Sequence, residues 1–126
     1  MKAELIDKPI DYLNSFSLHD VRIENIKIDV NAKTMEIAVV DLNWNYEGSG
    51  GYLSRPCSIV FSGAIAYFID ILDLEGIRID HNLARLVDGL AHVDIHLNEG
   101  GGDLSWESRR SSISIKFESM EIRDRL

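Results

Sequence analysis

Apolar and polar side chains alternate at a period of two over several stretches of this 126-residue chain. This period is typical of β-strands with one buried face. In residues 21–30 the apolar residues change phase near Glu24 and Asn25, and in residues 35–46 they change phase near Val40 and Asp41. A change of phase predicts a bulge or bend, because one inserted residue turns the following side chains to the other face.

The two stretches together predict one long hairpin. If they pair around residues 31–34, with Val30 opposite Met35, both changes of phase fall on the same rungs of the ladder. Two independent helices would have no reason to show this coincidence. We therefore expect a coiled antiparallel hairpin that bends from one layer of the fold to another.

An internal repeat about fifty residues apart extends the prediction to the second half of the chain. Residues 23–31 and 74–82 are identical at five of nine positions. Further along, residues 37–45 align with residues 90–98. Both halves are therefore expected to contain the same arrangement of strands.

Each half also has a third apolar run, at residues 57–69 in the first and 112–122 in the second. The repeat predicts a second hairpin over residues 74–97. Apolar residues between 83 and 91 also fit helical spacing, which leaves a helical turn open as an alternative there.

These patterns predict a mainly β protein, an antiparallel sandwich or partly closed barrel. It is built from two hairpin-plus-strand units, about residues 17–69 and 70–126, related by an approximate twofold axis within a single domain, residues 1–126. Pro9 suits the first turn of a short N-terminal helix. Gly63, in the middle of an apolar run, indicates a bulge or a close approach of another backbone.

Composition and charge narrow the classes of partner. The chain has a net charge of −8, with 45% hydrophobic and 27% charged residues, the balance of an ordinary globular domain. Such an acidic surface repels phosphate, so we expect no nucleic-acid binding. The most apolar stretch, residues 59–72, is too short and too often interrupted to span a bilayer. No signal sequence is recognisable at the N-terminus, so we expect no membrane association and a cytoplasmic location.

No catalytic constellation is recognisable, and no catalytic residue or cofactor is predicted. Cys57 is the only cysteine, begins an apolar run and is expected to be buried and inert. The serines of residues 111–114 lie in a predicted strand without the glycines of a nucleophile elbow. His19 and Asp20 are expected to form a turn that leads into the first strand, because neighbouring strand residues face opposite sides.

One candidate site is a metal site on a single strand. His92, Asp94 and His96 alternate with apolar residues, so all three side chains are expected on one face. Alternate residues lie roughly 6.5–7 Å apart, a distance that two converging imidazoles can bridge to one metal ion. A pair of histidines on a solvated strand face is the competing interpretation, and no further ligand follows at a recognisable spacing.

The other candidate site consists of two glycine-rich loops, residues 45–55 and 98–108. Neither loop has the Lys-Ser/Thr pair of a phosphate-binding loop. Aromatic and acidic side chains at such loops are suited to binding a protein partner. The predicted partner-binding residues are Trp44, Tyr46, Glu47, Tyr52, Glu99, Asp103 and Trp106.

Two short segments carry a family resemblance. Ser-Leu-His-Asp at residues 17–20, before a long hairpin, and Ser-Ile-Val-Phe-Ser-Gly at residues 58–63 resemble small bacterial β-rich proteins, largely uncharacterised. Some of these proteins are grouped with the immunity proteins of toxin systems. The resemblance implies an acidic, non-catalytic protein that binds and plugs a toxin.

The sequence thus predicts a non-enzymatic protein-binding module, with an immunity-type or inhibitor role implied by the resemblance. Unpaired edge strands in such a fold also favour homodimerisation. The alternative is a metal- or small-ligand-binding β domain centred on His92, Asp94 and His96.

Overall fold

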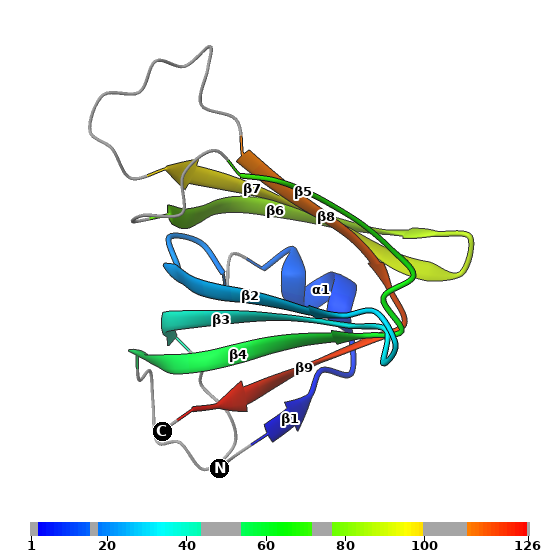
Figure 1. Ribbon diagram of the computed structural model, residues 1–126, viewed down its shortest axis with the longest axis horizontal. Helices are drawn as coiled ribbons and strands as arrows, with labels where there is room; N and C mark the ends of the chain where they lie inside the picture. Colours follow the sequence, from blue (N-terminus) through cyan, green and yellow to red (C-terminus); the bar gives the residue numbers. More distant parts are fainter. Residues whose placement is uncertain (1–2, 16–17, 44–53, 72–76, 100–110, 126) are drawn as a thin grey trace.

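The structure, a computed structural model, describes residues 3–15, 18–43, 54–71, 77–99 and 111–125. These residues form two antiparallel sheets that face each other, with one short helix between them (Figure 1). One sheet has the strand order β1-β9-β4-β3-β2 and the other the order β5-β8-β7-β6. The predicted mainly β sandwich is confirmed. The elements are β1 Ala3–Leu5, α1 Pro9–Leu13, β2 Ile23–Asp29, β3 Thr34–Asn43, β4 Ser54–Ser62, β5 Ala66–Asp70, β6 Ile77–Val87, β7 Leu90–Glu99, β8 Ser111–Phe117 and β9 Ser119–Asp124.

The alternation of the strands produces one shared core between the sheets. In β8, every second residue from Ser111 to Phe117 is buried, and the residues between them are partly exposed. The same pattern in the central strands of both sheets places branched side chains in the interior. Burying such side chains stabilises the fold by roughly 1.5–3 kcal/mol each. The isoleucines with no exposed surface are Ile37, Ile59, Ile77, Ile79, Ile95, Ile113, Ile115 and Ile122.

The first predicted hairpin is confirmed, but its predicted register is wrong by two residues. Met35 lies opposite Ile28 and not opposite Val30. The reason lies in the turn, where the Asp29 carboxylate accepts a hydrogen bond from the Ala32 N–H at 3.0 Å. This local bond draws residues 30–33 into the turn and leaves Val30 73% exposed. A shift by two residues keeps the pairs from Asn25 to Asp29 on their predicted faces, while the bulge beyond Asn25 shifts the register by one more residue and places Ile23 opposite Val39.

The predicted irregularities are also present, although they do not move the strands to another layer. The β2–β3 register shifts between Ile23 and Asn25, and the β3–β4 register shifts between Val39 and Leu42. Both β2 and β3 nevertheless stay within one sheet. The expectation that this hairpin bends from one layer to another was therefore wrong, since the bulges only turn side chains within the sheet.

The second hairpin is formed by β6 and β7, and β6 is a continuous strand through residue 87. Asp88 and Gly89 have φ angles of +51° and +81°, so they form the two-residue turn with left-handed residues that suits the twist of a hairpin. The helical turn considered for residues 83–91 is not formed. Leu83 and Leu86, which fitted helical spacing, lie on the strand with 59% and 68% of their surface exposed.

Each predicted third strand is divided in two by a corner and continues into the opposite sheet. β4 lies in the first sheet and β5 in the second, while β8 lies in the second and β9 in the first. Consequently β9 pairs with β4 and β5 pairs with β8. The two halves therefore exchange their last strands, and the connectivity of one half repeats that of the other.

The approximate axis between the halves passes close to two phenylalanines. Phe61 ends the apolar run of β4 and Phe117 ends that of β8, at matching positions of the repeat. Their rings contact each other edge to face, with centroids 4.8 Å apart, and neither ring is exposed. Two equivalent residues can contact each other only next to the axis that relates them. This contact therefore agrees with the predicted twofold relation.

Gly63 forms the corner between β4 and β5, and the group that approaches it most closely is a side chain and not the backbone that was predicted. Its φ angle is +64°, in the left-handed region that favours glycine. A Cβ atom at this position would lie 2.6 Å from Cγ of Glu118, the residue at the other corner. The two corners thus pack directly against each other, and the absence of a side chain at Gly63 makes this possible.

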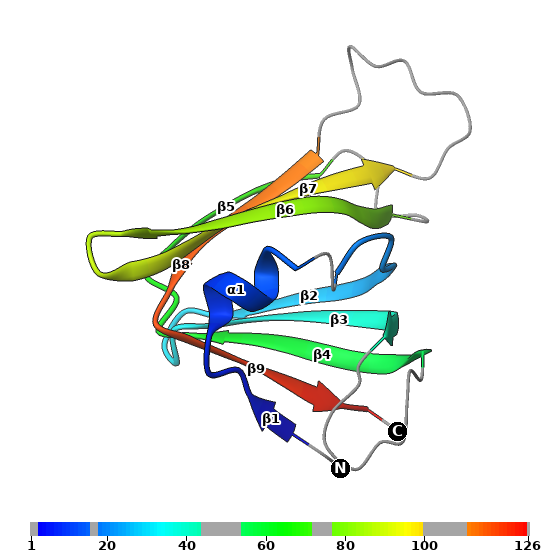
Figure 2. The same ribbon diagram turned by 180° about the vertical axis from the view of Figure 1, so that it is seen from behind.

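The N-terminal segment covers two parts of the sandwich. The predicted helix is present as α1, which begins with Pro9 and lies between the two sheets, as Figure 2 shows from behind. Its residue Leu13 is buried in the core. After the helix, the Asn14 amide donates to the Ala84 carbonyl at 3.0 Å and accepts from the Ala84 N–H at 2.8 Å. Before the helix, β1 pairs with β9. The sequence pattern did not predict β1.

Candidate functional site

The predicted partner-binding loops lie almost entirely outside the described residues. Trp44, Tyr46, Glu47, Tyr52, Asp103 and Trp106 all belong to segments that the structure does not describe. Glu99 is the last residue of β7, and its backbone lies opposite Ile77 of β6. The assignment of these loops to partner binding therefore stays a prediction.

The predicted metal-binding strand is β7, and its side chains are arranged as the alternation indicated. His92, Asp94 and His96 are partly or largely exposed, while the residues between them are buried. All three therefore face outward from the four-stranded sheet. His92 Nε2 lies 3.4 Å from Asp94 Oδ1, and the Ser114 hydroxyl donates to the same Asp94 oxygen at 2.6 Å.

This cluster gives no catalytic arrangement and stays a hypothesis as a metal site. Asp94 lies between Ser114 and His92, so the serine bonds to a carboxylate and not to a histidine base. Among the described side chains, no three His, Cys, Asp or Glu residues form a group placed to hold a metal ion.

His19 and Asp20 form the expected turn before β2, but their contacts reach the second sheet. The His19 ring nitrogen Nδ1 lies 2.5 Å from the Asp80 carbonyl oxygen, so Nδ1 is the donor. The Asp20 N–H donates to the Ile79 carbonyl at 2.7 Å. With a bridge between Arg22 and Arg78, these bonds join the segment just before β2 to the first residues of β6.

Cys57 is confirmed as a buried residue with no exposed surface. Burial, together with the nearby Asp124 carboxylate, raises the pKa of its thiol to about 11. Because only the thiolate is a good nucleophile, this cysteine is unreactive at neutral pH, as expected.

The unexpected feature is β5, an edge strand with large exposed apolar side chains. It pairs with β8 on one side, and no other described strand lies on its second side. Ile65, Tyr67 and Phe68 are 55%, 43% and 61% exposed. The period of two over residues 57–69 predicts Ile65 and Tyr67 on the same face as Phe61. Tyr67 does lie on the inner side of its sheet, opposite the buried Ile115, but the corner at Gly63 leaves Ile65 outside the strand and exposed.

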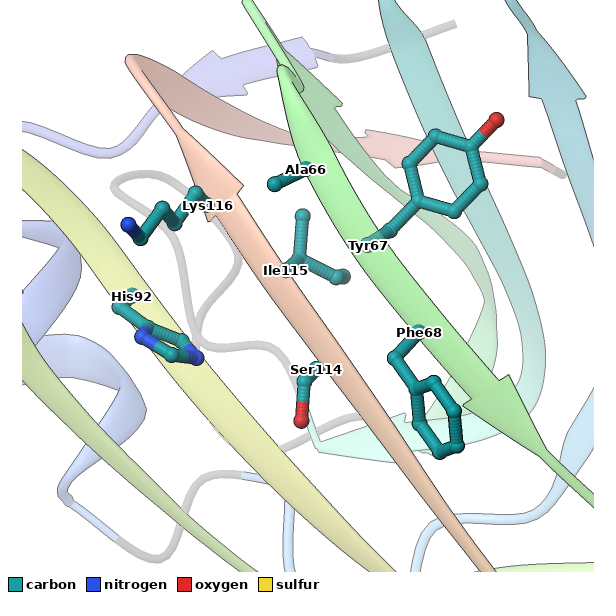
Figure 3. A pocket seen from close by; sticks show the side chains of 7 residues that line it. All are labelled: Ala66, Tyr67, Phe68, His92, Ser114, Ile115 and Lys116. Carbon is teal, nitrogen blue, oxygen red and sulfur yellow. The ribbon is translucent and has the colours of Figure 1, made fainter.

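Two cavities flank β5. One has a volume of about 200 Å³ and opens on the outer face of the sheet, where Phe68 and Ala66 of β5 adjoin His92, Ser114 and Lys116 (Figure 3). The other has a volume of about 320 Å³ and is lined by Ile65, Ala64 and the turn between β2 and β3. Tyr67 lines both cavities. Together, β5, Ile65 and the two cavities are named the β5 edge site.

The other sheet edges in the described part of the chain are covered, short or charged. β9 is covered by β1, which has only three residues. β6 is bonded at its first residues to the segment just before β2, and Asn14 occupies part of its remaining edge. Among the described strands β2 pairs with β3 alone, but it contains the charged residues Glu24, Lys27 and Asp29. Natural sheets commonly protect their edges in such ways, because unpaired N–H and C=O groups form hydrogen bonds with other chains. β5 has no lysine and no proline.

A sequence signal for this site existed but did not specify it. Residues 64–69 read Ala-Ile-Ala-Tyr-Phe-Ile, so both faces of the strand are apolar. Such a run is usual in a strand buried on both faces, and only the strand order reveals that β5 lies at an edge.

Comparison with known proteins identifies no relative. No family model, curated protein or solved structure matches this chain. Within the described residues, no helix has the length and apolar character needed to cross a membrane.

Proposed function

We propose that this protein is a non-enzymatic protein-binding module, and that the β5 edge site accepts an extended segment of another polypeptide. The observation that carries this proposal is the exposed, apolar edge of β5, which no other described strand covers. In this mode of binding, a partner strand adds to the sheet through backbone hydrogen bonds, while its side chains contact pockets on alternate faces.

The geometry of the β5 edge site fits the two requirements of strand addition. β5 supplies five consecutive residues in extended conformation. Its two flanking cavities include one on the outer face of the sheet, beside Phe68. Successive side chains of a docked strand point to opposite faces, so they would enter these two different environments.

Site-specific photo-crosslinking in the native host tests this proposal. A benzoylphenylalanine residue replaces Phe68 in one variant and Leu83 in the control variant. Leu83 is a matched control because it is 59% exposed, against 61% for Phe68, and lies on β6 at the opposite edge of the same sheet. We expect discrete products at position 68 that map to one short segment of a polypeptide.

A synthetic peptide with the sequence of that segment then provides a second measurement. Its binding should slow hydrogen exchange of the amides in residues 66–70, because outward N–H groups become hydrogen-bonded. The absence of discrete products at position 68, or the same products at position 83, would overturn the proposal.

A small-ligand site is the second candidate function, favoured by the cavity beside β7. Its lining combines the apolar Phe68 with Lys116 and His92, groups suited to a small ligand with a carboxylate and an apolar part. Native mass spectrometry and elemental analysis of protein purified from its host should then detect a stoichiometric ligand or metal. Protein that carries neither, and whose thermal stability chelation does not change, would contradict this candidate.

The resemblance to immunity proteins suggests one partner class for the proposed binding function. A net charge of −8 favours association with a basic protein. A toxin gene beside the gene for this chain, and cross-linking of position 68 to that toxin, would support an immunity role.

A further inference from the structure

The outer face of β5 has a regular arrangement of side chains set by its pairing with β8. Ala66 lies opposite Lys116, Phe68 opposite Ser114 and Asp70 opposite Ser112. Residues opposite each other in an antiparallel pair share a face, so Ala66, Phe68 and Asp70 face outward with these partners. Tyr67 and Ile69 face the other side.

This strand is complementary to itself. In an antiparallel pair of two β5 strands centred on Phe68, Phe68 lies opposite Phe68 of the partner subunit and Ala66 lies opposite Asp70 of the partner subunit. Tyr67 then lies opposite Ile69 of the partner subunit. All five residues are paired, and no carboxylate lies opposite another carboxylate. Like charges directly opposite each other would destabilise the pair.

The same register brings opposite charges together across the new interface. One row of the extended sheet contains Lys116 and Ala66 of one subunit and then Asp70 of the partner subunit. The first and last are two strand spacings apart, roughly 9–10 Å between Cα atoms. The small side chain of Ala66 leaves room for Lys116 to reach across it. Within the described part of the chain, neither Lys116 nor Asp70 has an ion-pair partner.

We infer that the segment docked at the β5 edge site is β5 of a second copy of this chain, paired antiparallel about a twofold axis at Phe68. The inference rests on the proposed function, since it names the partner at the same site. The two four-stranded sheets become one eight-stranded sheet, and the two Phe68 rings form an apolar contact on its outer face. Because the twofold axis repeats every contact, the pair of Lys116 with Asp70 of the partner subunit occurs twice in this interface.

Sedimentation equilibrium of purified protein from about 1 μM to about 1 mM tests this inference, a range chosen to include weak dimers. We expect a reversible monomer–dimer equilibrium. Asp70→Lys and Lys116→Asp each replace two attractions by two repulsions and should raise the dimer Kd about tenfold or more. The double variant restores the attractions with reversed signs and should return the Kd to within about threefold of the original value.

Asp7→Lys is the matched control. Asp7 is exposed and lies outside the β5 edge site. Its substitution by lysine changes the net charge of the chain by the same amount as Asp70→Lys. It should not raise the dimer Kd, because the repulsion between two acidic chains decreases. Phe68→Asp, which places two carboxylates opposite each other, should abolish the dimer. Thermal unfolding of each variant confirms that the fold is retained.

A monomer at every concentration, or a dimer that the charge variants leave unchanged, overturns the inference. The proposed function fails separately, when photo-crosslinking at position 68 gives no discrete product. Cross-linked products that map to a different protein, together with a strict monomer in sedimentation, would refute the inference that a second copy docks at β5. The same result would support strand addition at β5 by another protein.

Discussion

β5 and β9 arise in the same way from the two halves of the chain, but their surroundings differ. Each continues a third strand past a corner and joins the opposite sheet. β9 has β4 on one side and β1 on the other, and alternate residues along it are buried. β5 has only β8 beside it in the described part of the chain, and four of its five residues are exposed.

The difference shows what an internal repeat does and does not determine. The repeat sets the hairpins, the corners and the contact of Phe61 with Phe117, which need only residues within the two units. β1 precedes the repeated units and covers only one of the two equivalent edges. The edge that no other described strand covers is the one with exposed aromatic side chains, and the proposed function is located there.

The largest loss of stability is expected when the contact between the rings of Phe61 and Phe117 is removed. Phe61→Ala and Phe117→Ala should each lower the free energy of unfolding by about 3–5 kcal/mol, because each leaves a cavity in the core. Urea denaturation of both variants measures the loss. Similar losses would agree with equivalent roles in the two halves. A loss below about 1 kcal/mol in either variant would contradict the packing described for that half.

The two corners provide the next test. Gly63→Ala should lower the free energy of unfolding by more than the roughly 1–2 kcal/mol expected for a left-handed alanine, because the new Cβ also meets Glu118. Gly89→Ala is the matched control, since its φ angle is also positive but no atom lies within 4 Å of the added Cβ. Equal losses in the two variants would show that the corners do not pack closely.

A smaller effect is expected at the protected edge of β6. Asn14→Ala removes both hydrogen bonds to the backbone of Ala84 and should cost about 1–2 kcal/mol of stability. Hydrogen exchange at the Ala84 amide should become faster, while exchange in β8 changes less. Unchanged exchange at Ala84 would mean that Asn14 does not protect this edge.

The smallest change in stability is expected at β5 itself. Phe68→Asp should change the free energy of unfolding by no more than about 0.5 kcal/mol, because the ring is largely exposed. Leu83→Asp should behave in the same way and serves as the control. Chemical denaturation at a protein concentration below the dimer Kd gives both values. A loss above about 2 kcal/mol for Phe68→Asp would mean that the ring supports the fold and not a contact.

The candidate sites were less predictable than the strands. The shared face of His92, Asp94 and His96 followed from alternation alone, because a strand imposes it locally. The hydrogen bond from Ser114 to Asp94 joins two strands and required their register. The β5 edge site required still more, namely the order of all strands in the sheet.

By itself, the sequence determined the elements: the strands from their period of two, the bulges from the changes of phase, and the helix from Pro9. These features depend on backbone geometry over a few neighbouring residues. Tertiary structure alone decided the register at Asp29, the crossing of strands at Gly63 and Glu118, and the pairing of β1 with β9. Such features depend on contacts between residues far apart in the chain, for which a pattern along the sequence contains no direct information.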